Sequence, residues 1–137
     1  MNAPYDIFRY SLLTALIDWR TENLVLSAWV GTPDYDPEDR TVNDIKLRGN
    51  VEAGYSLPIN GTSVTMDGTA QTDQVLIPDV PIGPDVTWFT LARSNATHDL
   101  SELVQFVDEA ENLPFTPNGL DIVVQPDWIQ QRGWFRP

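Results

Sequence analysis

The sequence contains no cysteine and only one histidine among its 137 residues. Disulfide bridges and thiolate metal sites are therefore excluded. A structural zinc site needs three or four nitrogen or sulfur ligands, which a single histidine cannot supply. We therefore expect the protein to bind neither a metal ion nor any other cofactor.

Basic residues are also scarce, with 8 Lys or Arg against 20 Asp or Glu, a net charge of −12 and a pI near 4.1. This charge argues against binding to nucleic acid or to an anionic membrane surface. No apolar run approaches the length of a membrane span. The N-terminus lacks the basic start and apolar stretch of a secretory signal. We expect a protein made in the cytoplasm that contacts neither nucleic acid nor membrane.

What the chain does contain is a series of short apolar runs separated by 11 prolines and 8 glycines, which is typical of all-β domains. One helix is predicted from Tyr5 to Asp18, where Phe8, Leu12 and Leu16 recur every four residues. The predicted strands are Asn23 to Val30, Tyr55 to Ile59, Thr62 to Met66, Gln71 to Ile77, Val86 to Ala92, Glu102 to Asp108 and Gly119 to Gln125. Together they predict a mainly β, single-domain antiparallel β-sandwich of about seven strands, with the N-terminal helix packed against it through a broad apolar face. Trp29 and Trp88 lie in two of the apolar strands and are predicted to belong to the core.

Turn-forming residues separate these elements. Asn60-Gly61 predicts a hairpin and Asp67-Gly68 a second turn. A short helix is possible from Thr41 to Leu47, before Gly49. The connection from Pro78 to Pro84 contains three prolines, which prevent ladder pairing there.

The C-terminal residues differ from the acidic segment before them. Seven Asp or Glu lie between Asp99 and Asp127, and the last seven residues carry two arginines, two large aromatics and no acid. Trp and Arg often anchor protein interfaces. We therefore divide the chain into a sandwich domain at residues 1–125 and an extension at residues 126–137 for contacts between subunits. The predicted interaction residues are Trp128, Arg132, Trp134, Phe135 and Arg136.

An alternative for this extension remains open. Trp134 and Phe135 are costly to leave in water, so the tail could instead fold back onto its own domain. If it acts as a free anchor, deleting Gln131 to Pro137 should leave a folded domain that no longer binds its partner.

Few residues carry the signs of catalysis or of cation binding. His98 beside Asp99 could form half of a triad, but no nucleophile elbow is present, so a solvated loop histidine is favoured. Asp34 to Asp39 resembles a calcium loop, although Pro37 and the missing glycine break the EF-hand pattern. This loop and the cluster from Asp108 to Glu111 are the places where a cation could bind, and solvated acidic turns are the favoured interpretation. No catalytic residue is predicted, and we do not expect an enzyme.

Several short motifs occur in a fixed order along most of the chain. In sequence they are Tyr5-Asp6, Leu12-Leu13, Ile17-Asp18-Trp19, Asn23 to Leu26, Thr32-Pro33-Asp34-Tyr35, Leu103 to Asp108, and Leu113 to Gln125 with its Pro117-Asn118-Gly119. Each motif is weak alone. In this order, from Tyr5 to Gln125, the chain resembles a group of small virion proteins of tailed bacteriophages.

The resemblance implies a structural protein of the virion, of the capsid decoration or cement type. Such a protein would be made in the host cytoplasm, bind the outer face of the major capsid protein lattice and stabilise the shell. We expect it to act as a homotrimer at a local symmetry axis. The alternatives are a tail, neck or baseplate component, a carbohydrate-binding β-sandwich for host recognition that uses exposed tryptophans, or a small hydrolase dependent on His98.

Overall fold

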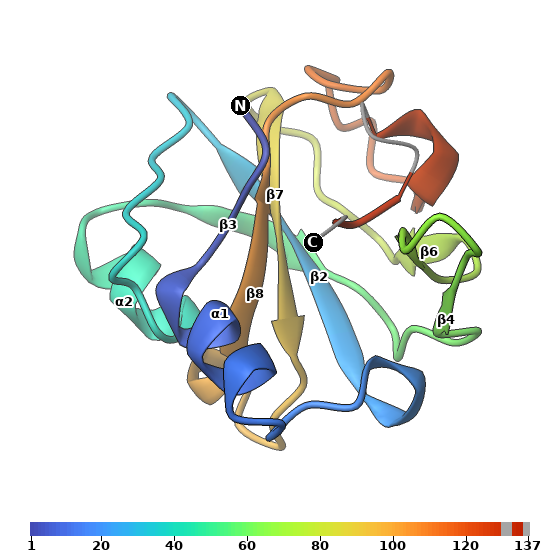
Figure 1. Ribbon diagram of the computed structural model, residues 1–137. Coiled ribbons are helices and arrows are strands. Elements are labelled where there is room, and N and C mark those ends of the chain that lie inside the picture. The colour runs from blue at the N-terminus through green and yellow to red at the C-terminus, as the bar shows by residue number, and fades with distance from the viewer. Residues whose placement is uncertain (130–132, 136–137) are drawn as a thin grey trace.

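The computed structural model describes residues 1–129 and 133–135 of the chain (Figure 1). Its α-helices are α1 (Asp6–Leu13) and α2 (Val42–Leu47), and its 3-10 helices are η1 (Trp19–Thr21), η2 (His98–Leu100) and η3 (Pro126–Trp128). Its strands are β1 (Ala3–Pro4), β2 (Leu24–Val30), β3 (Glu52–Tyr55), β4 (Ser63–Val64), β5 (Ala70–Gln71), β6 (Val75–Ile77), β7 (Val86–Arg93), β8 (Glu102–Val107) and β9 (Ile122–Val124).

Five of these strands form one antiparallel sheet in the order β1-β8-β7-β2-β3. β7 lies at its centre, between β2 and β8. β2, β7 and β8 are buried on both faces over most of their length, which explains their nearly continuous apolar sequences. Trp29 and Trp88 are fully buried and stack with their ring centroids 5.3 Å apart. The prediction that both tryptophans belong to the core is confirmed.

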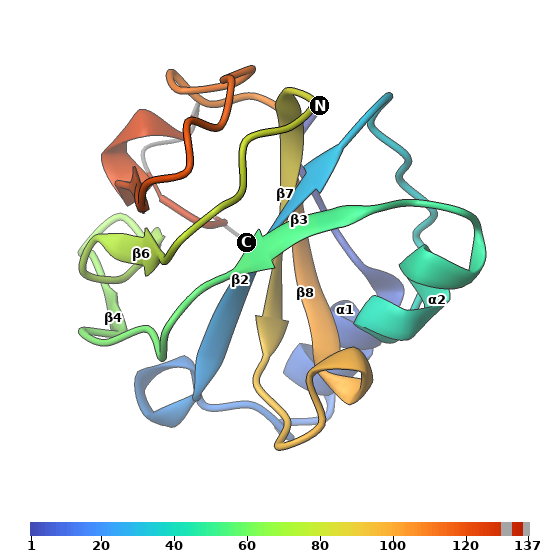
Figure 2. The same cartoon turned by 180° about the vertical axis from the view of Figure 1, so that it is seen from behind.

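Each face of this sheet is covered by a different layer (Figure 2). On one face, the pairs β4-β5 and β6-β9 enclose a core that includes Leu26, Phe89 and Val124. On the other face, α2 contributes Val42 and Ile45 to a second core around the two stacked tryptophans. The chain is a mainly β, single-domain antiparallel sandwich, as predicted.

The N-terminal helix is shorter than predicted because it is capped before Asp18. α1 ends at Leu13, and Ala15 adopts a φ of +58°. Leu16 N then donates to Ser11 O at 2.9 Å, which is the bond of a Schellman cap, a motif that usually places glycine at the left-handed position. The cap turns the chain away toward η1, so the helical spacing of the sequence continues past the end of the helix.

The helix also buries less than its sequence predicts. Phe8 is buried, but Leu12 and Leu16 are 37% and 61% exposed. α1 therefore packs against the sandwich through Phe8 and Ser11, and the predicted broad apolar contact is wrong. Ile7 is half-buried against the second core, and the other apolar side chains of α1 are exposed.

The two predicted turns have different outcomes. Asp67-Gly68 joins β4 to β5, as expected. The predicted hairpin at Asn60-Gly61 is wrong, because the segments on its two sides do not pair with each other. The segment after β3 lies instead between β2 and β6, where Leu57 N donates to Leu76 O at 3.1 Å. The single strand predicted from Gln71 to Ile77 is divided into β5 and β6, which belong to different sheets.

Candidate functional site

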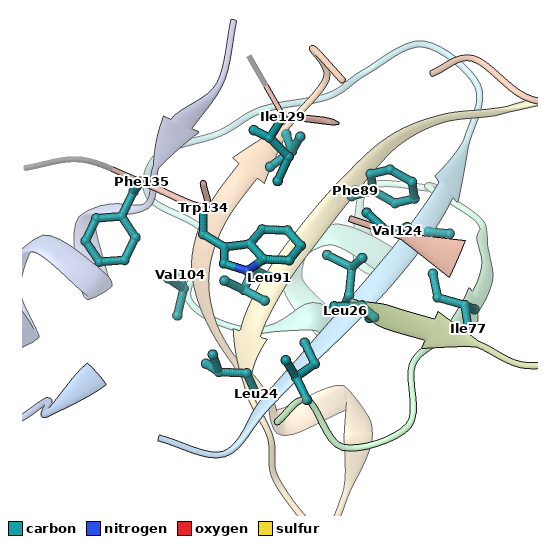
Figure 3. Packing of buried hydrophobic residues seen from close by; sticks show 14 of the residues in the cluster. Leu24, Leu26, Ile77, Phe89, Leu91, Val104, Val124, Ile129, Trp134 and Phe135 are labelled. Carbon is teal, nitrogen blue, oxygen red and sulfur yellow. The ribbon is translucent and has the colours of Figure 1, made fainter. Parts of the chain in front are cut away.

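The aromatic residues near the C-terminus lie inside the domain. Trp134 is fully buried, and Phe135 is 9% exposed. Figure 3 shows Trp134 beside Leu91 in the core, with Phe135 to one side, toward the N-terminal helix. Trp134 N donates to Ala70 O at 2.9 Å, and Ala70 N donates to Phe135 O at 2.8 Å. The segment therefore runs beside β5 and is held by main-chain hydrogen bonds.

Side-chain contacts hold the same segment. The indole Nε1 of Trp134 donates to Thr72 Oγ1 at 2.8 Å, which satisfies its buried N–H group. The ring of Phe135 meets Phe8 at 4.8 Å and Trp19 at 5.2 Å between centroids, both edge to face. The C-terminal aromatics thus connect α1, η1 and β5.

Gly133 permits this close approach. A Cβ atom at this position would lie 2.3 Å from Thr69 Cγ2 and 2.7 Å from the backbone oxygen of Ala70. The carbonyl cannot move away without breaking its hydrogen bond to Trp134. No side chain larger than that of glycine therefore fits at position 133.

These positions correct the expectation of a free anchoring tail. Trp134 and Phe135 complete the core of their own domain, which is the fold-back alternative that the sequence left open. Trp128 is half-buried in η3, while Arg132 and Arg136 lie outside the described residues. The boundary predicted after residue 125 does not separate two structural units, because residues 133–135 belong to the same core as β2 and β7.

His98 is mostly buried, with 14% of its side chain exposed, and is not the solvated loop residue that the sequence favoured. Its Nε2 lies 2.8 Å from Glu52 Oε2 and 3.4 Å from Ser27 Oγ, and its ring stacks on Tyr55 at 3.7 Å. A triad histidine uses different ring nitrogens for the acid and for the nucleophile. Here one nitrogen faces both groups, and Ser27 is fully buried, so this arrangement does not match a hydrolase site.

Lys46 extends this network to α2. Its Nζ lies 2.6 Å from Asp99 Oδ1 and 3.4 Å from Glu52 Oε1. The hydrogen bond from Lys46 lowers the pKa of Asp99. The network links α2, β3 and η2, and its geometry is that of a structural ion-pair cluster.

The acidic loop from Asp34 to Asp39 is bound by Arg48. Arg48 Nε lies 3.1 Å from Asp34 Oδ2, and Arg48 Nη1 contacts Asp39. Hydrogen bonds from Asn50 and from Arg48 lower the pKa of Asp34, whereas burial raises the pKa of Asp39. The guanidinium of Arg48 thus neutralises two carboxylates of the loop that the sequence analysis named as a possible cation site. Within residues 1–129 and 133–135, no group of three or more histidine or carboxylate side chains could hold a metal ion.

The second acidic cluster contacts the start of the chain. The amino group of Met1 lies 2.5 Å from both Asp108 Oδ1 and Glu109 Oε1. Asn2 Oδ1 accepts hydrogen bonds from the backbone N–H groups of Asp108 and Glu109 at 3.0 and 2.9 Å. These acids hold β1 beside the end of β8.

Two adjoining loops present apolar side chains to solvent. Ile82, in the loop from Pro78 to Pro84, is 79% exposed, and Leu120 is 65% exposed. Val80 N donates to Leu120 O at 3.3 Å, and a Cβ atom on Gly119 would lie 3.6 Å from Ile82 Cγ1. We call residues 78–84 and 118–121 the proline-loop surface.

The backbone of this surface is restrained. Its prolines fix φ at three positions of the first loop. Val80 is buried and anchors the middle of that loop, and Asp79 N donates to Asp121 Oδ1 at 2.8 Å. Sequence reasoning recognised that the prolines prevent strand pairing but missed this surface. The available signal was an isolated isoleucine in a segment that is otherwise rich in Pro and Gly.

None of the helices in the described ranges has the length and apolar content needed to cross a membrane. In comparisons with known proteins, no family model, curated protein or solved structure significantly matches this chain.

Proposed function

We propose that this protein is a structural component of a bacteriophage particle, of the capsid decoration type. It would act without catalysis, at the capsid surface, by binding the outer face of the major capsid protein lattice and stabilising the shell. Two arguments support the proposal. The first is the motif order from Tyr5 to Gln125 that resembles small phage virion proteins. The second, which carries the most weight, is the exposed apolar pair Ile82 and Leu120 on restrained loops.

The proline-loop surface has the properties of a docking surface. Restrained loops lose little conformational freedom on binding, so more of the contact energy remains as affinity. Asp79, Asp85 and Asp121 are exposed around the apolar pair. Such a rim favours a partner with basic side chains and repels an acidic one. Many copies on one shell would stabilise it together even if each contact is weak.

The proposal can be tested with shells prepared without this protein. Purified wild-type protein should bind them at a fixed number of copies per shell, measured by quantitative gel analysis and by cryo-electron microscopy. Ile82→Ser and Leu120→Ser should each reduce occupancy at least about tenfold, because each removes an apolar contact of up to a few kcal/mol. Neither change should lower the melting temperature, because both side chains are already in water.

Met66→Ser is the matched control, because Met66 is a fully exposed apolar residue on a different loop. Its occupancy should equal that of the wild type. Wild-type occupancy by the Ile82 and Leu120 variants would refute the role of this surface. The absence of a neighbouring major-capsid gene, together with no binding to any shell, would refute the function itself.

The other functions receive less support from the side chains. Trp19, Trp29, Trp88 and Trp134 are all buried, so none of them offers a sugar-binding platform. A tail, neck or baseplate location would use the same kind of surface. Imaging separates the two cases, since a decoration protein covers the shell and a connector protein occupies one vertex.

A further inference from the structure

The outer face of α1 carries apolar side chains that the domain leaves uncovered. Tyr10 is 60% exposed, Leu13 is 89% exposed, and Leu16, just beyond the helix, is 61% exposed. Tyr10 and Leu13 are three residues apart on the helix and therefore lie on the same face. Exposed apolar residues scattered singly are normal, but three within seven residues form a stripe that fits an interface.

A groove of about 640 Å³ lies beside this stripe. It is formed by α1 and by the segment that leads to α2, and its lining residues are Asp6, Ile7, Tyr10, Glu38 and Arg40. Asp6 N donates to Pro37 O at 2.9 Å, which fixes the helix against that segment. Tyr10 belongs to both the groove and the stripe, so the two features form one surface. We call it the α1 face.

The charges of the α1 face are unusual in this molecule. Asp6 is paired with Arg9 at 3.0 Å, but Glu38 and Arg40, both exposed, form no ion pair with any described residue. The other basic side chains of the described ranges each contact a carboxylate; these are Arg9, Arg20, Lys46, Arg48 and Arg93. Among the basic side chains that the structure describes, Arg40 is thus the one without an ion pair, and it lies two residues from the unpaired Glu38.

We propose that the α1 face binds a second copy of this chain about a two-fold axis. In such a contact the same patch is used twice, so that residue i meets residue j and residue j meets residue i. Arg40 of each copy then pairs with Glu38 of the other, while Tyr10 and Leu13 pack across the axis. Because the net charge is −12, most approaches between two copies bring carboxylates together. This face instead offers one unpaired charge of each sign beside exposed apolar side chains.

The size of the face indicates a weak association. A helix of eight residues is about 12 Å long, and contacts this small fall at the low end of specific interfaces. The contact should therefore depend on concentration. A two-fold contact produces a dimer, whereas the resemblance led us to expect a trimer. The contact does not depend on the proposed attachment to capsids.

Sedimentation equilibrium from about 10 μM to about 1 mM tests the proposal. The wild-type mass should rise from 15.4 kDa toward twice that value. Arg40→Glu and Glu38→Arg should each weaken self-association about tenfold, because the symmetry places two repulsive pairs in one interface. The double variant with both changes should restore it, since the charges are again complementary. Leu13→Ser should also weaken the dimer.

The control is Glu111→Arg, which makes the same change in net charge at an exposed position outside the α1 face. It should leave the association constant unchanged. The proposal fails if the wild type stays monomeric throughout, if the double variant does not recover, or if Glu111→Arg matches the effect of Glu38→Arg. It also fails if Leu13→Ser, whose side chain is too exposed to affect folding, dimerises like the wild type. Loss of shell binding by Arg40→Glu, with a wild type that remains monomeric, would assign the α1 face to the capsid instead.

Discussion

The hydroxyl group of Tyr5 is buried in the second core and has no hydrogen-bond partner among the described residues. Burial raises the pKa of this phenol far above its usual value of about 10. A raised folded-state pKa means that the protonated form is favoured in the folded protein. The stability that the folded protein gains from keeping Tyr5 protonated is therefore fully present below about pH 10. It is lost progressively as the pH rises above that value.

Tyr5→Phe should remove this alkaline loss. At pH 7 the free energy of unfolding should be unchanged or higher, because the change deletes an unpaired buried hydroxyl. Above about pH 10, the wild type should lose about 1.4 kcal/mol per pH unit more than the variant. Urea unfolding at pH 7, 10 and 11 measures both effects. Parallel pH profiles for the two proteins would show that Tyr5 does not control the alkaline limit.

At the residue scale, burial could be predicted from the sequence where a large apolar side chain lies in an apolar strand. Trp29 and Trp88 lie in apolar strands, and their burial was predicted from that fact alone. The prediction of a solvated His98 was wrong because the residues that surround it, Glu52 and Ser27, are 46 and 71 residues away in the chain. Trp134 was predicted as an anchor because its local sequence does not reveal the space beside β5.

At the scale of the element, the segment from Gly133 to Phe135 behaves as part of the sandwich. Its two main-chain hydrogen bonds to Ala70 and its buried indole place it beside β5. Its loss would open the core next to α1, because Phe135 is the residue that the ring of Phe8 contacts edge to face.

Gly133→Ala should lower the free energy of unfolding by about 1–3 kcal/mol, because the new methyl group has no room beside Thr69 and the backbone of Ala70. Trp134→Ala should cost about 3–5 kcal/mol through the cavity that it leaves. Deleting Gln131 to Pro137 removes both contacts, so we now expect it to destabilise the domain and not merely to release an anchor. Chemical denaturation measures each value.

The control is Gly83→Ala, where an added Cβ would have only Pro81 O nearby, at 3.9 Å. It should leave stability within about 1 kcal/mol of the wild type. Equal effects of the Gly133 and Gly83 variants would contradict the steric role of Gly133.

The local sequence pattern located the main strands, but it did not show which strands pair with each other. β2, β7 and β8 were placed nearly to their ends, because long apolar runs bounded by turns identify buried strands. Asn60-Gly61 has the residues of a hairpin turn, but turn residues do not decide which strands pair. α1 was drawn too long because Leu16 keeps the helical spacing after the cap at Ala15, and spacing alone does not reveal a cap.

At the scale of the whole molecule, the charge distribution and the two proposed surfaces are separate features. Figures 1 and 2 place α1 toward one end of the sandwich and residues 78–84 toward the other. One body could therefore contact a shell with one end and a second copy with the other. Five of the described basic side chains neutralise nearby acids, so the surplus negative charge is left on the surface.

Raising the ionic strength from about 10 mM to about 150 mM should therefore raise the melting temperature by a few degrees. The Debye length falls from about 30 Å to about 8 Å, which screens repulsion among the surplus carboxylates. The exposed ion pairs weaken as well, but such pairs contribute little. Calorimetry in sodium chloride at pH 7 measures the shift.

The same titration near pH 4.1, the calculated pI, provides the control. The net charge is then close to zero, and the salt effect should nearly disappear. A melting temperature that falls with salt at pH 7 would mean that the ion pairs outweigh the repulsion.

The burial of Trp134 also has a consequence for how the protein is made. Phe8 is synthesised well before Phe135, yet the two aromatic rings meet in the core. Contacts this distant in sequence form late in folding. The core therefore cannot close until position 135 has left the ribosome, and chains that stop short of it keep an open apolar cavity. Such products should be removed by cellular proteases, which would leave chains that reach Phe135 as the only copies available for assembly.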